Sequence, residues 1–591
     1  MHGGAAILGV VAAIQPFAEI RLRPGEEQRR EFEIAAKQVS LAVCRGKERR
    51  KMKRMRTLVL SMANAMNVRK LSVVSLAAAL WLWGVSAFGA GGAVASRADN
   101  AGAPAAYPSV APAVLSNADL LPAILPDSEV VMEMSADGLM ETPDWLKSLI
   151  LVEVRVDSAS ADRTLKGMGS VLDHLAQTGV NGIWLTPING GSHYTNHGIQ
   201  TISDRLTGEA TREKQFQAVK DFVTEAHNRN IRVFFDVITW GVNKNAPLLK
   251  NRPDWFGSFH EPYGGYFWKW DGNDELVEWF ASQLVDWFVR TGVDGFRCDC
   301  APNFAGYAPY AIAKDRMRRL GRKVVFISEN DSDRRNVFDF DQVAFWRNNH
   351  PKDGRWIGIS FLENNIVDMV VGGDEQIAPS SRIRPGSFRY YSYMLTSHDS
   401  KGYVVKGSPI NIGYQALFSP YLPIWYLGEE WNNPYVTTEP HFVQTKQPHW
   451  LYSNEIDWTA LDKPENRAFF ELVKKMIRIR RSHPEIFEHF PDDHRDSNIC
   501  KVSTGQPGLL QAYARFHSGK AVLVVPNNSD RELQFEVYIP RQAAGLHSTS
   551  PCRVTDMLSE TVVAEAATES FKALIGAGQL GVYLVSCPAN P

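Results

Sequence analysis

Hydrophobic residues between about 150 and 485 follow two alternating patterns. Short continuous apolar runs at residues 149–154, 180–185, 231–237 and 293–299 lack the polar alternation of a half-exposed strand, which favours buried parallel strands. Longer stretches at residues 167–177, 211–230 and 274–290 space their apolar residues three and four apart, as amphipathic helices do. Thr211 stands where the N-cap of one such helix is expected. The alternation predicts an α/β fold in which helices cover a parallel sheet or barrel over 141–487.

Two other regions depart from this alternation. An aromatic, glycine-rich insertion over about 240–273 follows the third predicted strand. From about residue 490, short β-rich runs at 509–516, 521–525, 533–539 and 580–585 are separated by turn residues. We therefore predict a small antiparallel β-sandwich over 488–591.

The N-terminal part differs in composition from everything after it. Residues 1–70 carry 15 Lys+Arg against 6 Asp+Glu, a net charge of +9, so the remainder of a chain with net charge −1 carries −10. That acidic remainder argues against nucleic acid as a partner. Residues 96–140 are rich in alanine and proline and are predicted to form a linker. A length of 591 residues suits a barrel with accessory domains.

Residues 1–95 are interpreted as an extension followed by an export signal. A short basic stretch at 66–70 precedes an apolar one at 71–90, and Ala93-Val94-Ala95 offers a small-residue cleavage site. We expect a signal at about 66–95, translation starting at Met62 or Met66, and a secreted or periplasmic protein. A membrane anchor is the weaker interpretation, and no membrane contact is expected after cleavage. The sequence sets no oligomeric state.

Three carboxylates fall where strands of the predicted barrel end. Asp299 closes the run 293–299, Glu329 closes 324–329, and Asp399 follows the run 393–398. The separations of 30 and 70 residues correspond to about one and two βα repeats. The three side chains can therefore meet at the mouth of a (β/α)8 barrel. Such a set suits acetal cleavage at a sugar, where one group attacks, one donates a proton and one stabilises positive charge.

Several segments, taken in order, resemble the α-amylase family of glycoside hydrolases. They are residues 179–187 (GVNGIWLTP), 235–237 (FDV), 292–299 (GVDGFRCD), 326–329 (FISE), 397–399 (SHD) and 426–430 (YLGEE). The resemblance covers about 150–590. It implies a TIM (β/α)8 barrel, a small domain B inserted after strand 3, and a C-terminal antiparallel β-sandwich. It also implies an oligo- or polysaccharide substrate.

The resemblance implies a role for each of the three carboxylates. Asp299 would be the nucleophile, Glu329 the general acid/base, and Asp399 would hold ring hydroxyls as the transition state forms. Arg297 shares a strand face with Asp299 and is expected to favour its ionised form, whereas Glu329 must keep a proton near neutral pH. Four further residues are assigned to substrate binding: Arg297, His398, His197 and Trp184. The activity expected is retaining cleavage of α-glycosides, or transfer to a sugar acceptor.

This sequence departs from the family pattern around those residues. Trp240-Gly241 stand where the family usually has an Asn-His pair, of which the Asn commonly ligates calcium and the His contacts the sugar. Calcium is therefore weakly supported, and no metal-ligating residue is assigned. Ile199-Gln200 replace a Tyr-Asp pair, and Pro302-Asn303 replace an acceptor-side Lys-His. The substrate is thus open between an α-glucan and an α-glucoside, with starch weakly supported.

A second interpretation belongs to another class of protein. A barrel descended from such enzymes could bind or scaffold carbohydrate without cleaving it, but retention of Arg297, His398 and all three carboxylates argues against this. Reducing-sugar release from a panel of α-glucans separates the two interpretations.

The cysteines and the insertion's aromatic residues leave other interpretations open. Cys298 and Cys300 are expected to pack toward the covering helices, and one pair among Cys500, Cys552 and Cys587 could form a disulfide. Six aromatic residues could stack on sugars or form the insertion's own core: Trp255, Tyr263, Tyr266, Phe267, Trp268 and Trp270. His193 could reach the site or lie in a surface loop.

Overall fold

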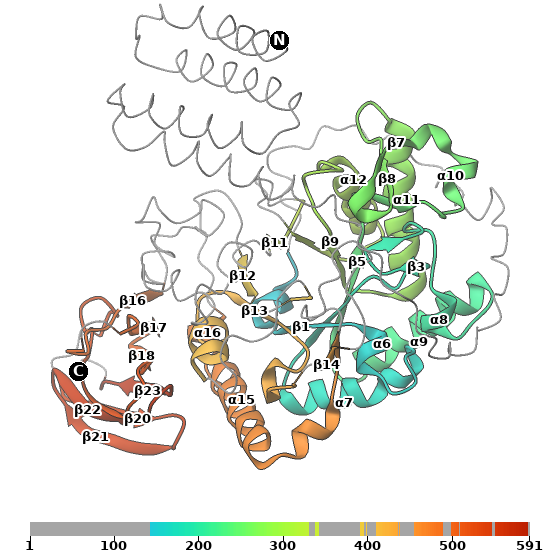
Figure 1. The fold of residues 1–591 in the computed structure, drawn as a ribbon. Helices are drawn as coiled ribbons and strands as arrows, with labels where there is room; N and C mark the ends of the chain where they lie inside the picture. Colours follow the sequence, from blue (N-terminus) through green and yellow to red (C-terminus); the bar gives the residue numbers. More distant parts are fainter. Residues whose placement is uncertain are drawn as a thin grey trace, which may run out of the picture. The chain divides into compact units, whose positions relative to one another are not determined.

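The computed structural model describes the chain from residue 142 to 588 with gaps. The described ranges are 142–329, 337–341, 390–394, 397–398, 409–434, 436–437, 454–488, 498–506, 509–546 and 550–588. The predicted signal and linker, and Asp399, lie outside them. Within these ranges a closed barrel of parallel strands is followed by a group of antiparallel sheets (Figure 1).

The barrel strands follow one another around the barrel in chain order. They are β1 (Leu151–Val154), β2 (Gly182–Leu185), β5 (Arg232–Val237), β9 (Gly295–Cys298), β10 (Val325–Ser328), β11 (Phe340–Asp341), β12 (Tyr390–Met394) and β13 (Leu422–Tyr426). β13 closes onto β1, with Leu151 opposite Ile424. Both faces of β1, β2, β9, β10 and β13 are buried, which explains why their sequences are apolar without alternation.

Helices with one apolar face cover the outside of the barrel. They are α7 (Gly169–Thr178), α9 (Arg212–His227), α11 (Asp274–Thr291), α12 (Ala308–Arg319) and α15 (Pro464–Ser482), with the shorter α6 (Val156–Ala159), α8 (Asp204–Thr207) and α16 (Pro484–Phe487) and the π-helix η8 (Ile410–Leu417). The Asn273 side chain accepts from the Leu276 N–H to begin α11, and Gly292 ends it at φ 77°. Thr211 takes the N-cap position of α9 but makes no side-chain capping bond there.

Short antiparallel strand pairs and helical turns also occur near the barrel. They are the pairs β3 (Gly191–Ser192) with β4 (Thr195–Asn196) and β14 (Val436–Thr437) with β15 (Asn454–Glu455), and the turns η2 (Asp144–Ser148), η3 (Lys166–Met168), η9 (Glu429–Trp431) and η11 (Trp458–Asp462).

The insertion after β5 folds as a small three-stranded sheet. Its elements are β6 (Gly241–Asn243), α10 (Leu248–Asn251), η4 (Pro253–Trp255), β7 (Phe256–His260), η5 (Glu261–Tyr263) and β8 (Gly265–Trp268), with strand order β6-β8-β7. A Cβ at Gly265 would lie 2.2 Å from the Val242 carbonyl oxygen, so close strand approach requires glycine there. Trp255 and Trp268 are buried against Trp279 of α11, so these aromatic residues form the insertion's core.

The C-terminal region consists of two antiparallel sheets around a second core. One has the order β16 (Ile499–Lys501), β17 (Tyr513–His517), β18 (Lys520–Pro526), β23 (Leu580–Ser586), β20 (Cys552–Asp556), β21 (Thr561–Ala567), and the other pairs β19 (Leu533–Tyr538) with β22 (Ser570–Ile575). Leu523, Phe535 and Phe571 lie in the core that both sheets share. Cys552 and Cys587 form a disulfide, whereas Cys500 is buried and unpaired.

Hydrogen bonds and apolar contacts join this region to the barrel. The Tyr414 hydroxyl in η8 donates to the Gln511 carbonyl (2.5 Å), and the Tyr513 hydroxyl donates to the Tyr414 carbonyl (2.8 Å). Leu580 of β23 belongs to the same apolar cluster as Met476 of α15.

The predicted fold class is confirmed: an α/β barrel with an insertion after the third barrel strand and antiparallel sheets at the C-terminal end. Among the described residues, none of the helices combines the length and apolar character that crossing a membrane requires.

Candidate active site

Charged side chains gather inside the barrel at the C-terminal ends of its strands. Glu153 on β1, Asp236 on β5 and Arg297 on β9 are buried, and Asp299 and Glu329 follow β9 and β10 directly. Asp236 lies opposite Arg297 in the register of β5 and β9, which brings these two charges together. The strand order thus brings Asp299 and Glu329 to neighbouring positions at one mouth, as barrel enzymes arrange their chemistry.

Arg297 is the centre of this cluster and is fully buried. Its Nη1 lies 3.0 Å from Asp236 Oδ1 and 2.9 Å from Asp299 Oδ1, and its Nη2 lies 3.1 Å from Glu329 Oε2. A guanidinium that is always charged and carries several fixed donors can bind three carboxylates at once. Arg297 therefore compensates the burial of all three, which is what permits negative groups to stand so close together.

Asp299 and Glu329 are near enough to act on one atom. A carboxyl oxygen of each lies within 4.8 Å of the other. Burial and the charge of Glu329 raise the pKa of Asp299, against the lowering effect of Arg297. The expected depression of the Asp299 pKa by Arg297 is therefore outweighed, because burial penalises the charged form and Glu329 is a like charge.

Asp236 holds the other side of Arg297 and has two further partners. Trp184 Nε1 donates to Asp236 Oδ2 (3.2 Å), and the Tyr194 hydroxyl donates to the same oxygen (2.6 Å). Trp184 is fully buried, and the Arg297 guanidinium lies 5.0 Å from its ring centroid. Trp184 thus contacts both Asp236 and Arg297. The contact of Trp184 with a sugar stays a prediction.

His398 lies in the same cluster, and Asp399 lies outside the described residues. The Tyr194 ring stacks on His398 with centroids 4.3 Å apart and planes 19° apart. The Glu153 carboxylate accepts from the His398 main-chain N–H at 3.2 Å. The sequence analysis did not assign Glu153, Asp236 or Tyr194 to the site. The sequence contains one signal for two of these residues, an acidic residue two positions after an apolar one in a strand. Glu153 follows Leu151 in this way, and Asp236 follows Phe234.

The two histidines after β2 take different places. His197 is half-buried, and its main-chain N–H donates to the Gly190 carbonyl (2.7 Å) in the turn that precedes β3. Among the described residues, no hydrogen bond or ion pair joins His197 to the carboxylate cluster, so its substrate contact stays a prediction. His193 is buried with Nε2 3.4 Å from Asp157 Oδ2. Although burial opposes it, bonds from His193 and Arg155 hold the pKa of Asp157 below its usual range.

Trp240 stands where the resemblance to α-amylases implies a calcium-ligating Asn. Its side chain is buried, and its Nε1 donates to the Tyr194 carbonyl (2.9 Å). An indole offers a donor and no oxygen, whereas calcium takes oxygen ligands. The residues at this position therefore do not fit the ion, and no chemical step is assigned to it. The Tyr263 and Trp240 ring centroids lie 4.8 Å apart and Tyr263 is partly exposed, and its stacking on a sugar stays a prediction.

Cys300 corrects an expectation drawn from strand alternation. β9 ends at Cys298, and Cys300 has φ 54°, so the chain has already turned and no longer alternates faces. Cys298 is buried in the main core as expected, but the Cys300 sulfur lies within 4.8 Å of carboxyl oxygens of Asp299 and Glu329. The Cys300 N–H donates to Glu329 Oε2. Burial and these two carboxylates raise the pKa of the Cys300 thiol, so it is neutral.

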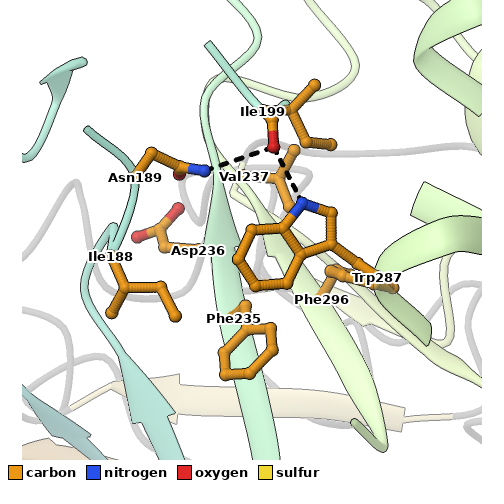
Figure 2. A pocket seen from close by; sticks show the side chains of 8 residues that line it. All are labelled: Ile188, Asn189, Ile199, Phe235, Asp236, Val237, Trp287 and Phe296. Atoms are coloured by element: carbon orange, nitrogen blue, oxygen red, sulfur yellow. Dashed lines mark hydrogen bonds between the residues drawn. The ribbon is translucent and has the colours of Figure 1, made fainter. Parts of the chain in front are cut away.

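A small cavity lies behind the cluster rather than at the mouth. Figure 2 shows Asn189, Asp236 and Trp287 lining it together with apolar side chains. The Ile199 carbonyl accepts from Trp287 Nε1 (2.8 Å) and from Asn189 Nδ2 (3.4 Å) at its edge (Figure 2). The cavity has room for about one water molecule and is too small for a sugar.

Two curated proteins are similar to this chain in sequence. No protein-family model matches the chain. An α-amylase from Dictyoglomus thermophilum is 21% identical over 59% of this chain and 66% of its own, and one from Haloarcula japonica is 25% identical over 58% of this chain and 52% of its own. The chain thus matches about two thirds of one curated relative and about half of the other.

Solved structures share the fold. A maltogenic α-amylase from Thermotoga neapolitana superposes with a TM-score of 0.53 at 16% identity, covering 75% of this chain and all of the other. At this identity the likeness shows the fold alone. In sequence the chain is similar to the two curated α-amylases named above.

Proposed function

We propose that this chain is an exported, retaining α-glycoside hydrolase or transglycosidase that acts on α-glucans or α-glucosides. The observation that carries the proposal is the convergence of Asp299 and Glu329 on Arg297, with carboxyl oxygens within 4.8 Å of each other. Retaining enzymes hold their two carboxyls about 5–5.5 Å apart, whereas inverting ones leave about 6.5–9.5 Å for a water molecule. The similarity to curated α-amylases supports the substrate class.

In the first half of the proposed reaction, Asp299 attacks the anomeric carbon. Glu329 gives its proton to the glycosidic oxygen as the bond between that oxygen and the anomeric carbon breaks. The products are a glycosyl ester on Asp299 and a released sugar hydroxyl. Asp399, assigned from the resemblance alone, would bind ring hydroxyls during this step.

In the second half, Glu329 acts as a base. It takes a proton from water or from an acceptor hydroxyl, whose oxygen attacks the anomeric carbon and breaks the ester. Attack by water gives hydrolysis, and attack by a sugar hydroxyl gives transfer. Two successive inversions return the α configuration.

The electrostatics of the cluster bear on the attacking group. Burial and the charge of Glu329 raise the pKa of Asp299, whereas the attack requires ionised Asp299. Arg297, which lowers that pKa, is the group that favours the ionised form. Arg297 contacts both carboxyls and stabilises a negative charge on either.

The decisive experiment measures reducing-sugar release from α-glucans and small α-glucosides. We expect activity in the wild type, none in Asp299→Asn, and wild-type activity in Asp144→Asn, a matched change at a carboxylate whose side chain is 96% exposed. Product NMR should show the α anomer first. Full activity in Asp299→Asn, or an inverted anomer, would contradict the proposal. Binding of glucans without release by any variant would favour the non-catalytic alternative.

Export is supported by the basic, apolar and small-residue order of residues 66–95. N-terminal sequencing of the protein recovered outside the cytoplasm should show that it begins just after Ala95. Recovery in the cytoplasm with residues 66–95 intact would contradict export.

A further inference from the structure

Aromatic side chains of the insertion divide between the two faces of its sheet. Neighbouring residues on a strand point to opposite faces, so Phe267 and Trp268 of β8 lie on different sides. The Trp268 ring packs on Trp279 of α11 and belongs to the insertion's core. The Phe267 side chain is half-buried and contacts a separate set of rings on the other face. That face is therefore not part of the core.

Rings on the Phe267 face form a series that starts at the candidate active site. The Tyr194 hydroxyl donates to Asp236 (2.6 Å), and the Tyr194 carbonyl accepts from Trp240 Nε1 (2.9 Å). The ring centroids of Trp240 and Phe267 lie 6.0 Å apart. The Phe304 ring then stacks on Phe267, with centroids 5.6 Å apart and planes 24° apart. The series thus runs from the buried carboxylate cluster to Phe304, which is 37% exposed.

Phe304 also belongs to the loop that follows the proposed nucleophile. The loop begins at Cys300, whose main-chain N–H donates to Glu329 Oε2. The Asn303 N–H donates to the Cys300 carbonyl (2.8 Å), and such a turn keeps the Cα atoms of Cys300 and Phe304 within about 11 Å of each other. Phe304 therefore lies on the side of the barrel mouth where Glu329 stands.

The proton donor defines where the leaving group lies. In the proposed function Glu329 protonates the glycosidic oxygen, so the departing group has to lie beside Glu329. The sugar that becomes bonded to Asp299 lies on the other side of that oxygen. Because Phe304 is in the loop that contacts Glu329, the stacked pair of Phe267 and Phe304 is placed to contact the departing group rather than the retained sugar.

The surface that this pair presents is apolar. A phenyl side chain has neither a hydrogen-bond donor nor an acceptor. Within residues 301–306 (APNFAG) one side chain, that of Asn303, is polar. A glucose unit on such a surface would leave several hydroxyl groups with few partners, whereas an aromatic ring would gain stacking and lose contact with water. The chemistry of the pair therefore matches an aromatic leaving group.

From this placement we propose that Phe304 and Phe267 form a subsite that takes the aromatic aglycone of an α-glucoside. The inference rests on the proposed function for the reaction and narrows its substrate class to α-glucosides of aromatic alcohols. In the first half of that reaction the bond between the anomeric carbon and the aglycone oxygen breaks. Asp299 becomes bonded to the anomeric carbon, and the aglycone leaves as a free alcohol that carries the proton from Glu329.

The test measures kcat/KM for benzyl α-glucoside, methyl α-glucoside and maltose. Benzyl alcohol and methanol have similar acidity, so a difference between their glucosides reports contact with the ring rather than the quality of the leaving group. We expect the wild type to cleave benzyl α-glucoside about 10-fold more efficiently than methyl α-glucoside. In Phe304→Ala, kcat/KM should fall about 10-fold for benzyl α-glucoside and change less than about 2-fold for methyl α-glucoside. Phe304→Tyr keeps a ring and should keep the preference.

A matched control lies on the opposite face of the same small sheet. Phe259 of β7 is 41% exposed, and its ring contacts Tyr266 with centroids 5.0 Å apart. Tyr266 precedes Phe267 on β8 and so points to the other face. Phe259→Ala thus removes a phenyl ring of similar exposure away from the proposed subsite. It should leave kcat/KM for all three substrates unchanged.

Three results would overturn the inference. They are a wild type that does not prefer benzyl over methyl α-glucoside, an equal loss on both glucosides in Phe304→Ala, and a larger loss on maltose, which would assign the ring pair to a sugar. A wild type inactive on every glycoside would instead refute the proposed function. Calorimetric titration would then still decide the subsite. Tighter binding of benzyl than of methyl α-glucoside, lost in Phe304→Ala, would support it, and equal binding would overturn it.

Discussion

Two layers of the barrel interior are built on the same strands and have opposite chemistry. The lower layer is apolar and dry, and includes Leu151, Phe234 and Ile327. Two residues further along each strand, on the same face, the upper layer has Glu153, Asp236 and Glu329. A step of one strand repeat, about 7 Å, thus separates a hydrophobic core from the candidate active site.

The difference shows that each layer is stabilised in its own way. The lower layer gains free energy from buried apolar area and close packing, and supplies a rigid base. The upper layer holds charges that would destabilise the fold if unpaired, so each needs a specific partner. Arg297 and His398 are those partners for the carboxylates described above.

The largest effect is expected from removing the cation of the upper layer. Arg297→Met leaves three buried carboxyls without compensation, and the free energy of unfolding should fall by about 3–5 kcal/mol. kcat/KM should fall about 1,000-fold because developing charge loses its partner. Denaturant titration and kinetics measure both. The control is Arg163→Met, at a side chain 55% exposed, which should change the free energy of unfolding by less than about 0.5 kcal/mol. An equal loss of stability in Arg297→Met and Arg163→Met would contradict the special role of Arg297 in the upper layer.

A large-to-small substitution in the lower layer should reduce stability without changing activity. Phe234→Ala opens a cavity under the cluster and should lower the free energy of unfolding by about 3–5 kcal/mol. At a temperature where the variant is folded, its kcat/KM should stay near the wild-type value. If activity falls as much as in Arg297→Met, the apolar base also sets the geometry of the charged layer.

The dependence of stability on pH should come from the charged upper layer and not from the apolar lower layer. The pKa of Glu153 is raised to about 8 in the folded state, above its ordinary value of 4.5. A raised pKa contributes stability that is complete at low pH and is lost as pH rises toward 8, by about 2 kcal/mol between pH 6 and 8. Urea titrations at both values should show this loss in the wild type and in Phe234→Ala, and a loss smaller by about that amount in Glu153→Gln, where the other buried carboxyls remain. An equal loss in Glu153→Gln would assign the dependence to another group.

The smallest effect is expected at Cys300. The thiol is held neutral beside Asp299 and Glu329, and Cys300→Ser keeps its size and turn. kcat/KM and stability should each change by less than about 1 kcal/mol. A loss comparable to that in Arg297→Met would give the sulfur a role in the chemistry.

Much of the fold could be predicted from the sequence because covered parallel strands and amphipathic helices leave clear patterns. The runs at 180–185 and 231–237 correspond to β2 and β5, and the insertion and the C-terminal sheets follow where composition changes. β11 was not predicted because it spans only Phe340–Asp341, too short for any periodicity. The domain boundaries stay predictions.

The site was harder to predict than the fold. Asp299 and Glu329 meet as barrel spacing suggested, because their strands are neighbours. Tyr194 could not be foreseen, since its place depends on a hairpin turn rather than on a strand end. Arg297 lowers the pKa of Asp299 as expected, but the net rise of that pKa could not be foreseen, because the sequence reveals a nearby cation and not the depth of burial. Asp399 stays a prediction.

The joint between the barrel and the C-terminal sheets has a consequence for biosynthesis. Leu580 and Val582 of the last strand belong to the apolar cluster that covers α15 and η8. On a ribosome these strand residues emerge after the parts of the barrel that they cover, so the newly made barrel exposes an apolar surface until β23 has been made. A chaperone that recognises exposed apolar surface would therefore be needed most in the interval between synthesis of α15 and synthesis of β23.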